Sequence, residues 1–496
     1  MTVLAVDAGT TGVTALLVTP DGRLAARGYR EFPQHFPHEG WVEHAPEEIW
    51  AAALDAVGQA LAVGKDAGAP PPTCVGITNQ RETVVLWDRE TLGSPRRAVV
   101  WQDRRTAGIC DQLRTDGAEP RIAELTGLRL DPYFSATKLT WLALNEPHTW
   151  AGVTAGRTAV GTVDSYLIAR MTRGLHHVTD ASNASRTLLF DIRAGAWSAE
   201  LGEVFRVPLD ALPEVVPSYG VVGRTDPTAF LGLDLPIAGI AGDQQAALFG
   251  QTCFAPGTSK CTYGTGSFIL VNTGETPVES DAGLLTTVAW GHPDGRLTYA
   301  LEGSVFVTGA AVQWLRDGLG IISSAAETEE LAASVADTGG VVFVPALTGL
   351  GAPDWDPTAR GVIVGITRGT TRAHVVRATL EAITFEVRDV VDLMVREAGV
   401  HLPALAVDGG AAANNFMCQL QADQLGVPVQ RPAVLETTGL GAAFLAGLGT
   451  GVWASTDELA STWRLDRRFE PGERDETGHR RWRAAVERAK GWAGAV

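Results

Sequence analysis

The chain has 496 residues, too many for one hydrophobic core, so its length predicts at least two large domains. Hydrophobic residues make up 45% of the chain and charged residues 20%, which is the composition of an ordinary soluble globular protein. The 57 acidic residues outnumber the 40 basic ones and give a net charge of −17. This balance argues against binding to nucleic acid or to an acidic membrane. A highly charged substrate would need local neutralisation, for instance by a metal ion and backbone amides.

The cysteines and the hydropathy pattern indicate a protein of a reducing compartment. The five cysteines are scattered and show no CxxC spacing, which argues against a disulfide framework or a zinc cluster. The N-terminal apolar stretch has no basic region before it and soon reaches Asp7, unlike a signal peptide. No uncharged apolar run is long enough to span a bilayer. We therefore expect a cytoplasmic protein without membrane insertion.

The first elements form a meander of short strands around a turn of small residues. Strands are predicted at Val3–Val6, Thr14–Val18 and Leu24–Tyr29, and the turn between the first two reads DAGTTG. Glycine and threonine at such a turn leave backbone N–H groups and hydroxyls free to surround an anion. Because most turns of this kind are only hairpins, the motif alone is weak evidence for a phosphate site.

The same pattern returns in the second half of the chain. Strands are predicted at Lys260–Tyr263 and Ser267–Val271, and GTG separates them. Two copies about half a chain apart suggest a duplicated architecture with one phosphate turn in each domain. The Gly/Pro-bearing segment around residues 250–257 is the predicted boundary, which gives an N-terminal domain at 1–249 and a C-terminal domain at 250–496.

Helices are predicted between the strands, at Glu47–Ala62, Val375–Met394 and His479–Trp492. In the second of them the apolar residues recur at helical spacing, so we interpret it as core packing. The third is basic and amphipathic. A surface helix with packed tryptophans is favoured there over a membrane anchor, because the whole protein is acidic.

A lone carboxylate marks the middle of the chain. The stretch Ile237–Gly250 reads IAGIAGDQQAALFG, which predicts a strand that delivers Asp243 to the tip of a strand-to-helix turn. An acid at that position can meet a ligand. It can also simply cap the helix, since aspartate is a preferred N-cap residue, and this stretch alone favours the cap.

Polar and aromatic segments elsewhere are compatible with a ligand pocket. The segment at 79–83 reads NQRET and follows a strand predicted at Val75–Thr78, so Arg81 and Glu82 could donate to and accept from a neutral hydroxyl. The alternative is a surface ion pair of little value. The segments WQDRRT at 101–106 and DPYFS at 131–135 offer aromatic rings with polar tips, although each alone is more often core. A third glycine cluster, VDGGAAANN at 407–415, follows a strand predicted at Ala404–Val407. It is not GxGxxG, which disfavours a dehydrogenase.

Taken together, these segments resemble the glycerol kinases of the FGGY carbohydrate-kinase family. The resemblance runs from Val3 to about Arg488, and the segments that carry it are GITNQRET, VVWQDRRTA, DPYFSATKLTW, TDASNASRTLLF, GIAGDQQAALFGQ, TYGTGSF, GLGAPDWDP and VDGGAAANNF. It implies an α/β fold of two actin-like (ribonuclease H-like) ATPase domains that flank a catalytic cleft. ATP would bind to the second domain and the polyol mainly to the first. It also implies Mg²⁺ as cofactor and a homo-oligomer, either dimer or tetramer.

The resemblance also assigns roles to individual residues. Asp243 would be the catalytic base, accepting the hydroxyl proton only as the O–P bond forms. The polyol would be bound by Arg81, Glu82, Trp101, Tyr133, Asp243, Gln244 and Phe268. The nucleotide would be held by Thr10, Thr11, Gly12, Thr265, Gly309, Gln313, Gly410 and Asn414. Mg²⁺ would be positioned by Asp7 and Asp243, directly or through water.

The chain departs from the family pattern in four places. Thr14 stands where a phosphate-facing arginine is expected, so we expect slower turnover or weaker ATP binding unless Mg²⁺ or Lys260 compensates. Asp354 replaces a frequent aromatic residue. The stretch Val216–Arg224 lacks the histidine that phosphotransfer proteins modify in some relatives, and Thr225–Asp234 lacks the loop that binds fructose 1,6-bisphosphate in others. Neither control is therefore expected.

The predicted function is ATP-dependent phosphorylation of glycerol to sn-glycerol 3-phosphate. Three alternatives stay open at this point. One is a kinase for another short polyol or triose, such as erythritol or dihydroxyacetone. Another is an actin- or chaperone-like ATPase on the same fold, since fold alone does not fix function. The last is a kinase-derived sensor that binds a sugar without transferring phosphate.

Overall fold

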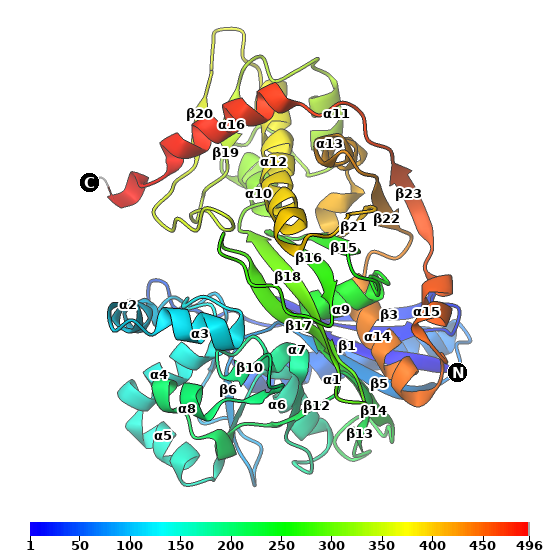
Figure 1. Cartoon of the computed structure of the whole chain (residues 1–496). Helices are drawn as coiled ribbons and strands as arrows, with labels where there is room; N and C mark the ends of the chain where they lie inside the picture. The colour runs from blue at the N-terminus through cyan, green and yellow to red at the C-terminus, as the bar shows by residue number, and fades with distance from the viewer. Residues whose placement is uncertain (495–496) are drawn as a thin grey trace.

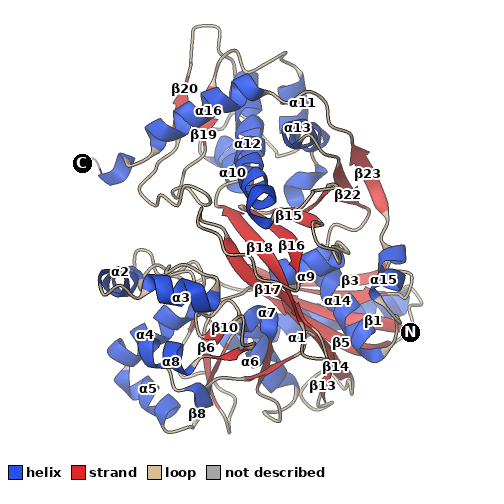
Figure 2. Ribbon diagram, viewed as in Figure 1, coloured by secondary structure: helices blue, strands red, loops and turns tan. Residues whose placement is uncertain are grey.

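Two mixed β-sheets and the helices around them form the frame of the protein, seen here in a computed structural model that describes residues 1–494 (Figures 1 and 2). The first sheet has the strand order β13-β14-β5-β1-β2-β3. Its strands are β1 (Thr2–Ala8), β2 (Gly12–Val18), β3 (Leu24–Glu31), β5 (Pro72–Asn79), β13 (Tyr219–Arg224) and β14 (Pro236–Gly242). The second sheet has the order β17-β18-β16-β15-β21-β22-β23. Its strands are β15 (Ser259–Tyr263), β16 (Ser267–Gly274), β17 (Leu285–Gly291), β18 (Leu297–Val305), β21 (Leu405–Asp408), β22 (Val429–Pro432) and β23 (Leu465–Phe469).

The two sheets repeat one arrangement. In the first, β14, β5 and β1 run parallel, and β1 continues into the antiparallel β2. In the second, β22, β21 and β15 run parallel, and β15 continues into the antiparallel β16. Each Gly/Thr turn joins the strand that lies between the parallel and the antiparallel parts to its hairpin partner. The duplicated architecture predicted from the repeated turn is therefore present.

Sixteen α-helices surround the sheets in the described part of the chain. They are α1 (Pro46–Asp66), α2 (Ala107–Thr115), α3 (Glu119–Thr126), α4 (Ser135–Asn145), α5 (Pro147–Thr154), α6 (Val163–Met171), α7 (Ala181–Ala184), α8 (Ala199–Phe205), α9 (Asp243–Gly250), α10 (Gly309–Asp317), α11 (Glu327–Ala333), α12 (Arg372–Ala398), α13 (Asn415–Leu425), α14 (Thr437–Thr450), α15 (Thr456–Thr462) and α16 (Glu476–Ala489). Short strands pair outside the main sheets: β4 (Glu43–His44), β6 (Val85–Asp88), β7 (Ala98–Val99), β8 (Thr158–Gly161), β9 (Val178–Asp180), β10 (Phe190–Asp191), β11 (Ala196–Trp197), β12 (Glu214–Val216), β19 (Val342–Val344) and β20 (Val362–Val364).

The core is layered. Helix α1 covers one face of the first sheet, and α12 packs on the second sheet. Between the two sheets lie α9 and α14, and side chains from both sheets meet them in one apolar cluster (Figure 1). Glycines make the close approach possible, because a Cβ atom at Gly441 would overlap the carbonyl oxygen of Ala246 in α9.

Helix α14 follows six of the second sheet's seven strands in sequence, yet it packs on β5, β14 and β1 of the first sheet. Just beyond it, Trp453 Nε1 donates to the carbonyl oxygen of Pro20 at 2.8 Å. The chain therefore returns to its N-terminal half after completing most of the second sheet. The domain boundary between residues 249 and 250 stays a prediction made from the sequence.

Of the two tryptophans predicted to pack at the C-terminal helix α16, one is buried and the other is exposed. Trp482 is buried, with 2% of its surface exposed, as expected for a packed surface helix. The prediction for Trp492 was wrong, because the helix ends at Ala489 and Trp492 is 63% exposed in the short turn that follows. Asp354, the residue in place of a frequent aromatic one, anchors this end of the chain. Its carboxylate binds Arg483 at 2.9 Å and Lys490 at 2.6 Å.

Candidate active site

Three parallel strands of the first sheet deliver the predicted polar residues to one edge. In register, Asp7 at the end of β1 lies opposite Thr78 of β5, and Gly242 at the end of β14 lies opposite Asn79. Because the carboxyl ends of parallel strands meet at the same edge of a sheet, ligand sites form there. The residues that follow β5 and β14, Arg81 and Asp243, are brought together at this edge.

Asp243 is paired with Arg81 and does not cap its helix. The N-cap residue of α9 is Gly242, and Asp243 is the first helical residue. Its Oδ1 lies 3.2 Å from Arg81 Nε and accepts a 2.7 Å hydrogen bond from the Gln244 N–H group. The Asp243 side chain is 26% exposed, whereas that of Arg81 is 2% exposed. Burial raises the pKa of Asp243, and the charges of Arg81 and Lys260 oppose that rise. Asp243 therefore does not occupy the N-cap position, and its carboxylate remains accessible to a ligand.

Arg81 belongs to a buried ring of alternating charges. Arg186 Nε lies 2.7 Å from Glu82 Oε1, and Arg186 Nη2 lies 2.9 Å from Glu302 Oε1. Arg81 donates to both oxygens of Glu302, through Nη2 at 3.1 Å and through Nη1. All four side chains are at most 2% exposed. Glu302 comes from β18 of the second sheet, so both halves of the chain build this site.

Sequence reasoning missed Arg186 and Glu302. Burial alone would raise the pKa of Glu302, but Arg186 and Arg81 outweigh it and hold the value at about 2. Glu302 is the only charged residue of strand β18, and an isolated acid in an otherwise uncharged strand is the signal that could have revealed it. Glu82 adopts a positive φ of 61°, a strained backbone conformation that is typical of functional sites.

The predicted aromatic residues lie beside this ring. The Trp101 and Tyr133 rings meet edge to face with centroids 5.5 Å apart, and Tyr133 Oη lies 3.3 Å from Arg81 Nη2. The Phe268 ring centroid lies 6.0 Å from the guanidinium carbon of Arg81. Trp101 Nε1 donates to Thr10 Oγ1 at 3.0 Å, which joins the aromatic residues to the first Gly/Thr turn.

The first turn depends on glycine for its shape. A Cβ atom at Gly12 would come within 2.8 Å of the Arg30 carbonyl oxygen and of the Tyr29 hydroxyl. Thr11 is exposed, and Thr10 is partly buried at the tip of the hairpin. Directly opposite Asp7 in the β1–β2 register is Thr14, which is also partly buried. The residue that departs from the family pattern therefore neighbours a predicted metal ligand.

The second turn lies against the start of α10. The carbonyl oxygen of Thr265 accepts from Thr308 and Ala310 N–H groups at 2.8 and 3.1 Å, and the Gly309 N–H group donates to Gly264 at 3.0 Å. One turn later on the same helix, Gln313 is exposed.

The third glycine cluster joins the second turn from the neighbouring strand. Strand β21 runs parallel to β15, and Gly409 after it has φ +84° and approaches the backbone of Tyr263. Gly410 is exposed at the start of a short 3₁₀ helix (Gly410–Ala413). Asn414 caps α13 by accepting from the Met417 N–H group at 2.9 Å, and it donates to Thr328 at 3.0 Å.

Asp7 and Asp243 provide oxygen ligands suited to Mg²⁺. Burial and then the charge of Asp243 raise the pKa of Asp7 to about 7. The Asp7 carboxylate receives no hydrogen bond from residues 1–494, so its oxygens are free to contact a cation. Within the same residues no group of three or more acidic, histidine or cysteine side chains could hold a metal. Two carboxylates supplemented by phosphate oxygens and water are the ligand set that Mg²⁺ commonly has.

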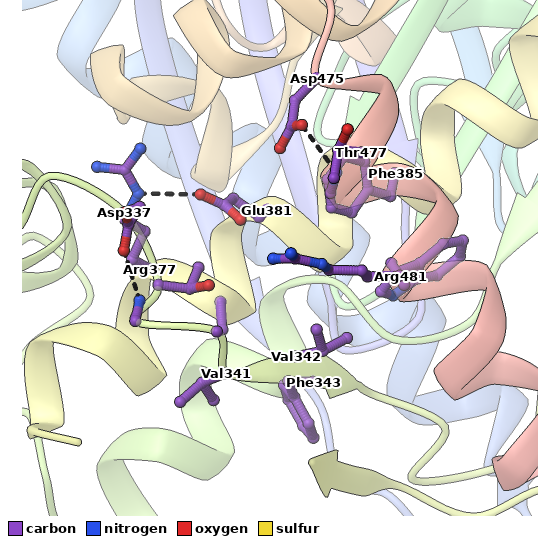
Figure 3. Close-up of a pocket in the computed structure, with 16 residues that line it drawn as sticks. Asp337, Val341, Val342, Phe343, Arg377, Glu381, Phe385, Asp475, Thr477 and Arg481 are labelled. Atoms are coloured by element: carbon purple, nitrogen blue, oxygen red, sulfur yellow. Dashed lines mark hydrogen bonds and ion pairs between the residues drawn. The ribbon is translucent and has the colours of Figure 1, made fainter. Parts of the chain in front are cut away.

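A separate cavity of about 410 Å³ lies in the second half of the chain (Figure 3). Its walls come from α12, from α16 and from the segment that precedes β19. Arg377 and Glu381 form an ion pair at 2.9 Å on one wall. None of the predicted site residues lines this cavity, so it is distinct from the candidate active site.

Sequence and structure comparisons place the chain among known proteins. The model of the FGGY family of carbohydrate kinases, N-terminal domain, matches residues 2–250, and the C-terminal domain model of the same family matches residues 259–450. The glycerol kinase of Symbiobacterium thermophilum is 54% identical over 494 residues, and glycerol kinase 2 of Thermotoga maritima is 53% identical over 495 residues. In both comparisons 99% of each chain is covered. No helix in the described residues is both long and apolar enough to cross a membrane.

Solved structures agree with the sequence comparison. The crystal structure of Plasmodium falciparum glycerol kinase with ADP superposes with a TM-score of 0.91 at 34% identity, covering 98% of both chains. A ligand-bound xylulose kinase from Lactobacillus acidophilus shares the fold, with a TM-score of 0.86 at 20% identity, covering 98% of this chain and 96% of that one. With two family models that together match most of its length, the chain belongs to the FGGY family of carbohydrate kinases.

Proposed function

We propose that the protein is an ATP-dependent glycerol kinase that transfers the γ-phosphoryl group of ATP to a terminal hydroxyl of glycerol and forms sn-glycerol 3-phosphate. The observation that carries this proposal is the placement of the accessible Asp243 carboxylate 3.2 Å from buried Arg81, beside an edge-to-face pair of aromatic rings. An acid, a polar wall and an aromatic wall are what a small polyol acceptor needs. The relatives with more than half of their residues in common carry the name glycerol kinase, which supports the same acceptor.

The polyol site follows from hydrogen-bonding chemistry. Arg81 can only donate hydrogen bonds and an ionised Glu82 can only accept them. Together the two side chains can therefore donate to and accept from the hydroxyl groups of a polyol. Tyr133 adds a hydroxyl beside Arg81. Trp101 and Phe268 pack against the carbon chain, and Gln244 contributes an amide beside the reacting hydroxyl.

The two Gly/Thr turns hold the nucleotide phosphates. Thr10, Thr11 and Gly12 supply hydroxyl and backbone N–H donors from the first half, and Thr265 does so from the second. The nucleoside lies over residues of α10 and of the third glycine cluster, namely Gly309, Gln313, Gly410 and Asn414. Asp7 and Asp243 would hold Mg²⁺, directly or through water, and the ion would neutralise charge on the phosphates.

Asp243 acts on the acceptor hydroxyl. An isolated carboxylate with a pKa near 4 does not deprotonate an alcohol in the ground state. Phosphoryl transfer passes through a loose transition state, so the hydroxyl proton becomes acidic only as the new O–P bond forms. Asp243 therefore orients the terminal hydroxyl, and its carboxylate accepts the proton late. Threonine hydroxyls and backbone amides stabilise charge on the transferring group, and closure of the two halves excludes water.

Coupled-assay ADP release with Mg²⁺-ATP tests the proposal. We expect strong stimulation by glycerol, with glycerol 3-phosphate as product, and weak stimulation by erythritol, dihydroxyacetone and sugars. Stimulation by a different polyol would keep the mechanism and change the acceptor. ATP turnover indifferent to every acceptor would indicate an actin- or chaperone-like ATPase, and absence of turnover with retained glycerol binding would indicate a sensor.

Thr14→Arg is expected to strengthen ATP use. An arginine at this position would stand opposite Asp7 at the first turn and add a charged donor to the phosphates. One such hydrogen bond corresponds to about a tenfold lower KM for ATP, or a comparable rise in kcat/KM. Steady-state kinetics of Thr14→Arg against the parent measures this, with Thr115→Arg, an exposed site on α2, as the control for added charge. Unchanged KM and kcat would mean that the missing charge is already compensated.

Two expectations from the sequence stay predictions. Assembly into a homodimer or tetramer can be measured by light scattering. Insensitivity of the reaction to fructose 1,6-bisphosphate can be measured in the same coupled assay.

A further inference from the structure

A buried lysine, Lys260, lies next to the candidate active site and makes hydrogen bonds that have not yet been described. Lys260 on β15 is 0% exposed, and within residues 1–494 no carboxylate oxygen lies within 4.0 Å of its ammonium group. Its Nζ atom donates to Gln244 Oε1, to Thr262 Oγ1 at 2.9 Å and to the Phe268 carbonyl oxygen at 3.3 Å. All three ammonium hydrogens are thus used on neutral acceptors. Burying a cation in this way is costly, so a purely packing role would be better filled by an apolar side chain.

The contact with Lys260 fixes the orientation of the Gln244 amide. A glutamine side chain can present either its oxygen or its nitrogen to a neighbour, but an ammonium group can only donate and therefore selects the oxygen. The amide nitrogen, Nε2, is consequently turned away from Lys260. No atom of the described residues accepts a hydrogen bond from Nε2, and Gln244 follows Asp243 in the first turn of α9.

The adjacent glutamine shows the contrast. Gln245 is 0% exposed, and its amide nitrogen donates to Thr287 and to the Val288 carbonyl oxygen at 3.1 and 3.3 Å. Its oxygen accepts from Arg81 at 3.3 Å. Every part of the Gln245 amide is therefore used within the protein. In Gln244 only the oxygen is used, and two N–H groups remain for a ligand.

We propose that Lys260 is a positioning residue for phosphoryl transfer, which locks the Gln244 amide so that its N–H groups donate to the oxygen that gains negative charge beside Asp243. The inference rests on the proposed kinase function and adds to it a residue that never touches the substrate. A donor fixed before the reaction stabilises developing charge without the cost of reorientation, which is the basis of electrostatic catalysis by preorganised groups. In this role Lys260 acts by fixing the orientation of the Gln244 amide, and the effect of its charge on Asp243 is secondary.

A double-mutant cycle between Lys260→Met and Gln244→Met tests the inference. Methionine keeps the length of both side chains and removes all hydrogen bonding. Gln244→Met is expected to lower kcat about 10²-fold through loss of the donor. Lys260→Met frees the amide and is expected to lower kcat by a similar factor of about 10², with KM for glycerol changed much less. If Lys260 acts through Gln244, the double variant has the kcat of Gln244→Met alone, whereas independent effects would multiply to about 10⁴-fold.

Lys138 provides a matched control. It is the other fully buried lysine, and its ammonium group donates to the backbone carbonyls of Pro132, Tyr133 and Phe134 at 2.5, 2.7 and 3.1 Å. Because it does not contact Gln244, the effects of Lys138→Met and Gln244→Met should multiply. This comparison separates specific coupling from the general loss of a buried cation.

Several outcomes would overturn the inference. One is a double variant at least tenfold slower than Gln244→Met, which would show that Lys260 acts on Asp243 through its charge. Another is a parental kcat in Gln244→Met. If Lys260→Met does not fold, the kcat of the double variant can still be compared with that of Gln244→Met. The double variant is expected to fold, because replacing both hydrogen-bonding partners with apolar groups of similar shape is close to neutral for stability. Failure of the proposed function is recognised separately, since the parent protein itself would then lack glycerol-stimulated ADP release.

Discussion

Asp243→Asn is expected to lower kcat for glycerol phosphorylation by about 10²- to 10⁴-fold, the range found for loss of a general base. Asparagine has the shape of aspartate, so the Gln244 N–H group still finds an acceptor at the start of α9. The amide does not accept the hydroxyl proton as the O–P bond forms. Glycerol and ATP should both remain bound, because Arg81, Glu82 and the two Gly/Thr turns are unchanged. Steady-state kinetics together with calorimetric binding of glycerol measures the two parts of this expectation.

Asp354→Asn is the matched control for this change. Asp354 is also an ion-paired aspartate, but its partners Arg483 and Lys490 belong to the C-terminal end of the chain. Its replacement should lower stability and leave kcat unchanged. Full activity in Asp243→Asn would remove this residue from the proton transfer, and an equal loss in both variants would indicate a general effect of losing an ion-paired acid.

The elements around Asp243 could be predicted because their signals are local. A short apolar run that ends at Gly242, followed by one acid and a helical pattern, contains the strand, the turn and the helix within fourteen residues. The two Gly/Thr hairpins were predictable for the same reason, since a short, almost continuously buried apolar strand and a turn of small residues each depend on near neighbours in sequence.

The charge ring could not be predicted, because its members are distant in sequence. Arg186 and Glu302 are separated by 116 positions, and Glu82 lies 104 positions before Arg186. Nothing in the sequence near any one of them indicates which partner neutralises it. The contact of Lys260 with Gln244 spans only 16 positions, but it joins β15 to α9, and no local pattern indicates that these two side chains meet. The resemblance to a family assigned roles to residues in contact with substrates. It assigned none to the buried residues that keep those side chains in position.

Helix packing between the halves shows a third kind of limit. The pattern of α14 is apolar on all sides, which indicates a buried helix without saying which sheet covers it. The structure places α14 between the two sheets, where glycine and alanine allow helix and strand backbones to approach closely. This choice depends on the fit of surfaces that are formed only after both sheets exist.

Glu302→Gln is expected to destabilise the protein and weaken glycerol binding together. Glu302 neutralises two buried guanidinium groups, those of Arg81 and Arg186. Its Oε1 lies 2.9 Å from Arg186 Nη2. Removing one partner of a buried ion pair costs about 3–5 kcal/mol, because the remaining charge stays buried without compensation. The apparent melting temperature should fall by several degrees, as measured by differential scanning fluorimetry. KM for glycerol should rise, because Arg81 loses the acceptor that orients its donors.

The exposed ion pair of Arg224 and Asp234 provides the control for the expected loss of stability in Glu302→Gln. Their side chains are 56% and 59% exposed and lie 2.7 Å apart, so Asp234→Asn removes an ion pair of similar geometry in water, where it contributes at most about 1 kcal/mol. Equal melting temperatures for Glu302→Gln and Asp234→Asn would contradict a structural role of the ring. A second comparison uses Arg186→Met, which removes one of the two arginines that are paired with both Glu82 and Glu302. Since Arg186 and Glu302 belong to one network, the double change should cost less than the sum of the single ones, and strict additivity would mean that the two residues act independently.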